Sequence, residues 1–185
     1  MIVIGITGTL GAGKGTIVDY LRNKGFAHYS VRGFLLEEIR KKGMPENRDS
    51  MVVVANGLRA AHSPSYITDQ LYLQALEHGK DAVIESIRTP GEIDSLRKKG
   101  NFYLFAVDAD PKKRFDRITI RKSETDNIDY LTFIENEKRE MSSDDPNKQN
   151  LAKCREMADF VFDNNGNIKE LNSKVSRIIT QINRI

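Results

Sequence analysis

Short apolar segments alternate with longer amphipathic segments along most of the chain. Five apolar runs have the length of a strand: Ile2–Thr7, Phe26–Val31, Ala82–Ile87, Phe102–Asp108 and Ala158–Asp163. The segments between them have the periodicity of helices. Strands that alternate with helices are typical of a parallel sheet covered by helices on both faces. The pattern therefore predicts an α/β fold of three layers with a five-stranded parallel sheet.

Several helix boundaries are marked by capping residues. Thr89-Pro90-Gly91-Glu92 offers an N-cap, a proline at the first helical position and an acid at the third, and Ser63-Pro64 and Asp110-Pro111 repeat the cap and the proline. Glycine should end helices at positions 25, 43, 79 and 100. The last helix, about Ile168–Ile185, should pack one apolar face against the sheet.

Two segments interrupt the alternation of strand and helix. Residues 32–78 contain only helical patterns, and residues 122–150 are polar and rich in charge. In an open α/β sheet, ligands bind beyond the carboxyl ends of the strands, where insertions can close over them. We expect one domain, residues 1–185. It should contain a helical insertion at about 32–78, which would bind one of the ligands, and a short lid at about 117–150.

Composition excludes several classes of protein. A chain of 185 residues with 39% apolar residues can bury a core without disulfides. A net charge of +3, from 29 basic and 26 acidic residues, is too balanced to indicate a nucleic-acid partner. The N-terminal apolar run is too short to cross a membrane and lacks the basic start of a secretory signal. The single cysteine and scattered histidines give no zinc spacing, so we expect a cytoplasmic protein without a structural metal.

A phosphate-binding loop follows the first strand. Its residues are Gly8, Thr9, Leu10, Gly11, Ala12, Gly13, Lys14, Gly15 and Thr16, and a helical stretch begins directly after them. Glycines allow backbone N–H groups to surround a polyphosphate, and the start of the helix adds a positive dipole end. Lys14 can reach the β- and γ-phosphates. Gly15 stands where a Mg²⁺-binding hydroxyl usually lies, so Thr16 is the nearest hydroxyl. The motif predicts ATP as a ligand and Mg²⁺ as a cofactor.

The loop and two other segments resemble nucleoside monophosphate kinases such as adenylate kinase. The Gly15-Thr16 ending is similar to theirs, and Val83–Arg88 looks like their strand that ends in an acid and is soon followed by an arginine. The resemblance implies that Glu85 binds Mg²⁺ and that Arg88 contacts the phosphates of donor or acceptor. An acid at the end of an apolar strand is also expected to be costly without a partner. A cap or a structural ion pair is the alternative for Glu85.

The third resembling segment is Asp116–Arg121, which is similar to the entry into the lid of those kinases. There the first arginine packs near the adenine and the second contacts phosphates, which assigns these roles to Arg117 and Arg121. Arg114, Arg117 and Arg121 recur at spacings of three and four, so one helix face should carry them toward the site. A solvated basic face is the alternative. Arg139 is expected to be a further catalytic arginine that returns from the lid.

The acceptor site should lie in the helical insertion, where Ser30, Arg32 and Arg59 are candidate substrate-binding residues together with Arg88. The Thr-Gly-Asp run of the resembling family is replaced here by Val31–Phe34, which argues against AMP as the acceptor. After the last strand, Asn164–Gly166 either touches the donor base or forms an ordinary turn.

The chain as a whole also resembles small microbial P-loop proteins described as adenylate-kinase-like and as related to dephospho-coenzyme A kinase. The segments that carry this resemblance are Glu85–Arg88 and Val107–Pro111. It makes dephospho-coenzyme A an alternative acceptor.

Two classes of function fit these motifs. The first is a phosphotransferase that moves the γ-phosphate of ATP to a nucleoside monophosphate or a similar small phosphorylated acceptor. The second is a regulatory protein that binds a nucleotide without turning it over. The arginines beyond the phosphate loop favour the kinase, because phosphoryl transfer needs positive charge on both sides of the transferred group. A regulatory GTPase is disfavoured because Asn147–Asn150 lacks the aspartate of the guanine-binding motif and does not follow a strand.

Overall fold

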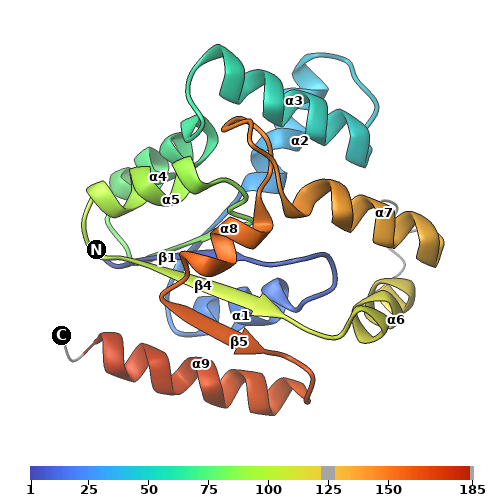
Figure 1. Ribbon diagram of the computed structural model, residues 1–185. Coiled ribbons are helices and arrows are strands. Elements are labelled where there is room, and N and C mark those ends of the chain that lie inside the picture. Colours follow the sequence, from blue (N-terminus) through green and yellow to red (C-terminus); the bar gives the residue numbers. More distant parts are fainter. Residues whose placement is uncertain (122–127, 184–185) are drawn as a thin grey trace.

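The sheet is the centre of the molecule. A computed structural model describes residues 1–121 and 128–183. In these residues five parallel strands pair in the order β2-β3-β1-β4-β5 (Figure 1). The strands are β1 (Val3–Thr7), β2 (Ala27–Ser30), β3 (Ala82–Glu85), β4 (Phe102–Asp108) and β5 (Phe160–Asp163). The predicted α/β sheet and its five strands are confirmed, and the strands begin or end one or two residues inside some predicted bounds.

Helices cover both faces of the sheet because the strands carry apolar side chains on both faces. Ile4 and Ile6 face α1 (Lys14–Asn23) and α9 (Ile168–Ile182) in one core. Val3, Ile84 and Leu104 belong to a second core on the other face. The helices that cover this face include α4 (Tyr66–His78), α5 (Pro90–Lys98) and α8 (Leu151–Glu156). The three-layer arrangement therefore follows from strands that are buried on both faces.

The two segments that interrupt the alternation of strand and helix both contain helices in their described residues. The first contains α2 (Val31–Lys41), α3 (Arg48–Ala61) and α4. The second contains α7 (Tyr130–Met141), which lies together with the preceding helix α6 (Pro111–Arg121) at one end of the sheet in Figure 1. Residues 122–127 of the predicted lid are outside the described residues. Within the part of the chain that the structure describes, none of the helices combines the length and apolar character needed to cross a membrane.

Local signals set most helix ends. Thr89 and Glu92 form the predicted capping box at the start of α5, with Pro90 at the first helical position. The glycines at positions 25, 43, 79 and 100 all have a positive φ just past a helix end. The prediction at Ser63-Pro64 was wrong by two residues, because α4 begins at Tyr66 and these two residues form a turn before it.

Strand register brings the carboxyl ends of neighbouring strands to one edge. Glu85 pairs with Ile6 of β1 on one side and with Ser30 of β2 on the other. The segments that follow these strands are the phosphate loop, α2 and the stretch from Ser86 to α5. The fold therefore gathers the candidate residues of distant segments at one edge of the sheet.

Candidate functional site

The phosphate loop has a backbone that requires glycine. Gly11 has a φ of 77° and Gly13 a φ of 108°, in the left-handed region that favours glycine. A Cβ at Gly11 would lie 2.4 Å from the backbone oxygen of Arg114. The Lys14 ammonium donates to the carbonyl oxygens of Gly8 and Thr9, both at 2.9 Å. The lysine is thus folded over its own loop, beside the start of α1.

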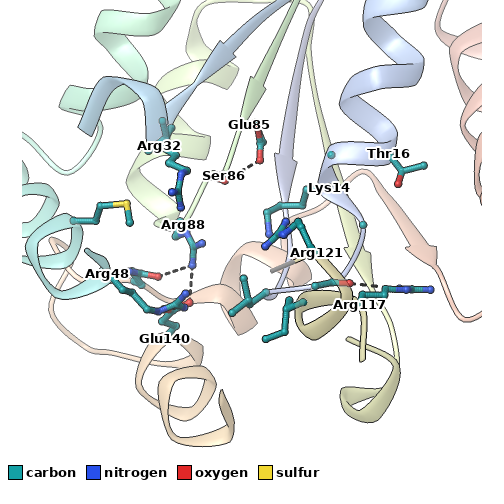
Figure 2. Close-up of a pocket in the computed structure, with 18 of the residues that line it drawn as sticks. Lys14, Thr16, Arg32, Arg48, Glu85, Ser86, Arg88, Arg117, Arg121 and Glu140 are labelled. Atoms are coloured by element: carbon teal, nitrogen blue, oxygen red, sulfur yellow. Dashed lines mark hydrogen bonds and ion pairs between the residues drawn. The ribbon is translucent and has the colours of Figure 1, made fainter. Parts of the chain in front are cut away.

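A single cavity of about 720 Å³ extends from this loop toward α2 and α3. Figure 2 shows Arg48, Arg88 and Glu140 grouped together, with Lys14 of the phosphate loop to their right. The predicted residues that line the cavity are Leu10, Gly11, Gly13, Lys14, Gly15, Thr16, Arg32, Arg59, Glu85, Arg88, Arg117 and Arg121. The volume is in the range of small-molecule sites, so a nucleotide and a second small ligand could share it.

Lys14 lies among several charges inside this cavity. Burial, followed by the nearby Arg88 charge, lowers its pKa from 10.5 to about 7, although Glu85 and Glu140 act in the opposite direction. A lysine with this pKa is readily protonated when a polyphosphate arrives. Perturbed groups of this kind are frequent at functional sites.

Glu85 is held by a histidine that the sequence analysis did not single out. The Glu85 carboxylate lies 3.0 Å from Nε2 of His28, which comes from the neighbouring strand β2. Burial acts to raise the pKa of Glu85, but the hydrogen bond with His28 and the Lys14 charge hold it below its usual value. Glu85 is therefore an ionised carboxylate beside the phosphate loop. Ser86, the next residue, has a φ of 72°, which is unusual outside glycine and marks a strained turn at the site.

Thr16 and Glu85, the two predicted Mg²⁺ ligands, do not converge. In Figure 2, Thr16 lies on the side of α1 away from Glu85, with Lys14 between them. No group of three or more metal-ligating side chains gathers in the described residues. Glu85 alone fits the chemistry of Mg²⁺, which commonly takes one or two carboxylates together with substrate phosphates and water.

The arginines of α6 divide into two kinds. Arg117 and Arg121 line the cavity. Arg117 donates to the carbonyl oxygen of Asn164 at 2.7 Å, so it joins α6 to the turn after β5. Arg114 was predicted to face the site with them, and this prediction was wrong. It is buried outside the cavity, donates to the Ala109 carbonyl oxygen and pairs with Glu137 of α7.

Arg88 is part of an ion cluster with residues of α3 and α7. Glu140, on α7, accepts from Arg88 at 2.7 Å and also pairs with Arg48 of α3. Arg88 donates further to the side-chain oxygen of Gln149 at 2.8 Å. Burial acts to raise the pKa of Glu140, but Arg88 and Arg48 hold it below its usual value. The cluster joins three elements that are far apart in the sequence.

Arg59 is more deeply buried than a surface substrate contact would be. Its side chain is about 1% exposed and pairs with Glu92 at 2.9 Å. Glu92 in turn accepts from the backbone N–H groups of Arg88 and Thr89. Arg59 lines the cavity from this position, and its Nε and Nη1 have no hydrogen-bond partner in the described part of the chain.

Several predicted residues are not brought to the cavity. Ser30 caps α2 by accepting from the Gly33 N–H, so its hydroxyl has a structural role. Arg139 is half-exposed on α7 and contacts Asn136 and Asp49 instead of the cavity, since the next residue, Glu140, occupies the inward position. The three loop residues that support the turn without lining the cavity are Gly8, Thr9 and Ala12.

A family model described as an AAA domain matches residues 4–143 of the chain. The chain belongs to this family. It is similar over nearly its whole length to UPF0200 proteins of archaea. The relative from Methanococcus maripaludis strain S2 is 28% identical and covers 97% of this chain and 98% of its own. The relative from Pyrococcus horikoshii is 24% identical and covers 98% and 97%.

Comparison with solved structures shows that this member of the AAA-domain family shares its fold with small-molecule kinases. TT1252 from Thermus thermophilus has a TM-score of 0.63 and 19% identity, with 97% of each chain covered. Shikimate kinase from Bacteroides thetaiotaomicron has a TM-score of 0.57 and 14% identity, with 97% of this chain and 98% of that chain covered. The fold is therefore that of the P-loop kinases, as the sequence predicted.

Sequence reasoning missed two groups of lining residues in this AAA-domain chain. The first group is Arg48 and Glu140, which are charged residues that no local motif connects with the phosphate loop. The apolar side of the cavity was missed because its residues read only as the apolar face of a helix. These residues are Val31, Leu35, Met51, Val52 and Ala55, which come from α2 and α3.

Proposed function

We propose that this chain is an ATP- and Mg²⁺-dependent phosphotransferase that moves the γ-phosphate of ATP to a nucleoside monophosphate or a similar small phosphorylated acceptor. The observation that carries the proposal is the continuous cavity. It joins the phosphate loop to a second region, which contains Arg48 and Arg88 and the apolar side chains of α2 and α3. A protein that only binds a nucleotide needs the first region, whereas a kinase needs both.

The donor end would hold ATP through backbone and cationic groups. The N–H groups of the phosphate loop and the start of α1 would surround the β-phosphate, and Lys14 would leave its carbonyl partners for the γ-phosphate. Arg117 and Arg121 would add positive charge from α6. Mg²⁺, held by Glu85 together with the ligand phosphates, would supply neutralisation of the triphosphate charge.

The acceptor end would position the attacking group. A phosphate oxygen of the acceptor would form a bond to the γ-phosphorus while the bond to the β–γ bridging oxygen breaks, and ADP leaves. Arg88, which lines the cavity between Lys14 and α3, would neutralise charge on the acceptor. Apolar residues of α2 and α3, such as Leu35 and Met51, would contact its uncharged part. Catalysis would rest on positioning and charge, without a covalent enzyme intermediate.

The helices around the cavity suggest how water is excluded. Residues of α2 and α3 line the cavity, and so do residues of α6 and α7. We infer that the first pair acts as the acceptor-binding insertion and the second as a lid within one domain. Closure of these helices over both substrates would dry the site before transfer.

An ADP-release assay tests the proposal. ATP and Mg²⁺ are supplied with a panel of ribo- and deoxynucleoside monophosphates, dephospho-coenzyme A, shikimate and gluconate, and products are identified by mass. We expect ADP release that depends on one phosphorylated acceptor. Lys14→Ala and Arg121→Ala should each reduce transfer by at least about a hundredfold, because each removes charge from the transferred group. Their circular dichroism spectra should be unchanged.

Arg97→Ala is the matched control. Arg97 pairs with Asp159 outside the cavity, so its loss should leave transfer intact. Full activity of Lys14→Ala or Arg121→Ala would contradict the assigned roles. ATP binding without transfer to any acceptor would instead identify a regulatory nucleotide-binding protein, and transfer only to shikimate or gluconate would overturn the phosphorylated acceptor.

A further inference from the structure

We propose that Glu140 occupies a binding site for the acceptor's phosphate group, formed by Arg48 and Arg88, and that the acceptor displaces it. The proposal rests on the proposed function, because it names the group by which the acceptor is held. It adds a second anion site, opposite the phosphate loop, with an internal carboxylate as its occupant.

The position of Glu140 is that of a bound anion. It is 4% exposed, and its two oxygens are divided between two guanidinium groups, one on Arg48 and one on Arg88. All three residues line the cavity that also contains Lys14. Figure 2 shows this cluster facing the space between Arg32 and the phosphate loop. A carboxylate between two arginines in a ligand cavity has the place that an acceptor anion would take.

The arginines offer more donors than Glu140 accepts. Nε of Arg48 is buried without a hydrogen-bond partner in the described residues, and so are Nε and Nη1 of Arg59, a third arginine that lines the same cavity. Buried donors are normally paired, so these three nitrogens indicate a ligand with more acceptor atoms. A carboxylate has two oxygens, whereas the terminal group of a phosphomonoester has three and a larger negative charge. A phosphate group therefore suits this cluster better than a carboxylate.

Glu92, which pairs with Arg59, is a second buried carboxylate, and its contacts keep it in place. One of its oxygens accepts from Arg59, and the other accepts from the backbone N–H groups of Arg88 and Thr89 at the start of α5. An acid at a helix start is favoured by the helix dipole. Glu92 is thus held by contacts that an incoming anion would not replace.

Glu140 is placed in the opposite way. It lies one residue before the end of α7 (Tyr130–Met141), where the helix dipole disfavours a negative charge. The contacts that favour its ionised form are those with Arg48 and Arg88. An incoming phosphate that binds these two arginines would remove the ion pairs that hold Glu140 in the cavity. Displacement of Glu140 therefore costs less free energy than displacement of Glu92 would.

Titration with inorganic phosphate tests the proposal. The full chain is first saturated with AMP-PNP and Mg²⁺, which fill the phosphate loop, and phosphate binding is then measured by calorimetry. Glu140→Gln removes the competing charge, and we expect it to bind phosphate at least fivefold more tightly than the unaltered chain. Glu135→Gln removes an exposed acid of the same helix and should stay within twofold.

Further arms separate the outcomes. The double variant Arg48→Gln/Glu140→Gln should lose the gain. Glu140→Asp, which is too short to reach both arginines, should bind phosphate with intermediate affinity and serves if the glutamine variant does not fold. Equal or weaker phosphate binding by Glu140→Gln would show that Glu140 only positions the arginines, and would overturn the proposal. A larger gain for acetate than for phosphate would overturn the assignment of a phosphate group.

The proposed function fails independently. Absence of AMP-PNP binding would contradict the phosphotransferase, while the difference between Glu140→Gln and Glu135→Gln still reports on the anion site.

Discussion

Lys14 shows how far a residue's chemistry depends on its neighbours. The motif places a lysine after Gly13, and the structure confirms that this lysine lies at the phosphate loop. Its lowered pKa, however, comes from burial and from Arg88, which is 74 positions away in the sequence. No local pattern contains that information, so the charge state of Lys14 is a property of the folded chain.

The lowered pKa of Lys14 predicts a pH-dependent affinity for ATP. Burial and the charges of Arg88 and Arg48 lower the pKa of Lys14 in the free protein to about 7, against the opposite effect of Glu85 and Glu140. Bound phosphates favour the charged lysine, so its pKa is higher in the complex. Below pH 7 the lysine is charged in both states. Above pH 7 binding must take up a proton, and affinity should fall by up to about tenfold per pH unit.

Calorimetric titration with ATP between pH 6 and pH 9 measures this dependence. Lys14→Met has no titrating group at this position and serves as the control, with weaker binding and a flatter profile. Parallel profiles for the two proteins would show that Lys14 does not change its protonation on binding.

Arg59 and Arg88 were both predicted to bind the substrate from their sequence positions. Both line the cavity, but Arg59 is also half of a buried ion pair with Glu92. Arg139, which was predicted to be a catalytic arginine of the lid, faces away from the cavity. A run such as Glu135–Glu140 is so dense in charge that the side facing the cavity depends on the packing of α7. In this helix the inward residue is Glu140.

At the scale of elements, the phosphate loop is the segment whose sequence and structure agree most closely. Glycines at Gly11 and Gly13 have backbone angles that other residues rarely adopt, and the first turn of α1 follows at once. Thr89–Glu92 likewise forms the capping box that its spacing predicts. Both are local devices, which need contacts only within a few residues.

Two glycines of the loop should respond oppositely to alanine. Gly11→Ala would place a Cβ 2.4 Å from the Arg114 carbonyl oxygen at a φ of 77°, so we expect a loss of at least about 2 kcal/mol in the free energy of unfolding. Gly15 lies in the first turn of α1 with nothing within 4 Å of such a Cβ. Gly15→Ala should keep or raise stability, by up to about 1 kcal/mol.

Urea denaturation of the two variants compares them directly. A Gly11→Ala protein as stable as the unaltered chain would mean that the loop and α6 can move apart without cost. A large loss in Gly15→Ala would contradict the open space beside α1.

At the scale of the whole molecule, the cavity couples the phosphate loop to several elements. Residues of α1, α2, α3, α6 and α7 line it together. A ligand that binds there and not to the unfolded chain must raise the stability of the whole fold. At a hundredfold excess over its dissociation constant, ATP with Mg²⁺ should add about 2.7 kcal/mol. For a chain of this size that corresponds to an increase of about 5–10 °C in Tm.

Differential scanning calorimetry with and without ATP and Mg²⁺ measures this increase. Lys14→Ala should have nearly the same Tm without ligand and a much smaller increase with it. An equal increase in both proteins would place ATP outside the phosphate loop.

The sequence by itself determined the strands, the phosphate loop and most helix ends, because these depend on apolar periodicity, glycine conformations and capping over a few residues. It also indicated Glu85, Arg88, Arg117 and Arg121, because they lie in segments that resemble nucleoside monophosphate kinases.

Only the tertiary structure decided which charged side chains meet. His28 reaches Glu85 because β2 and β3 pair in register, and Arg48, Arg88 and Glu140 meet because three elements pack around one cavity. Such contacts span 57 positions in the first case and 52 and 92 in the second. Apolar burial fixes these distances, and the sequence pattern around each residue carries no record of them.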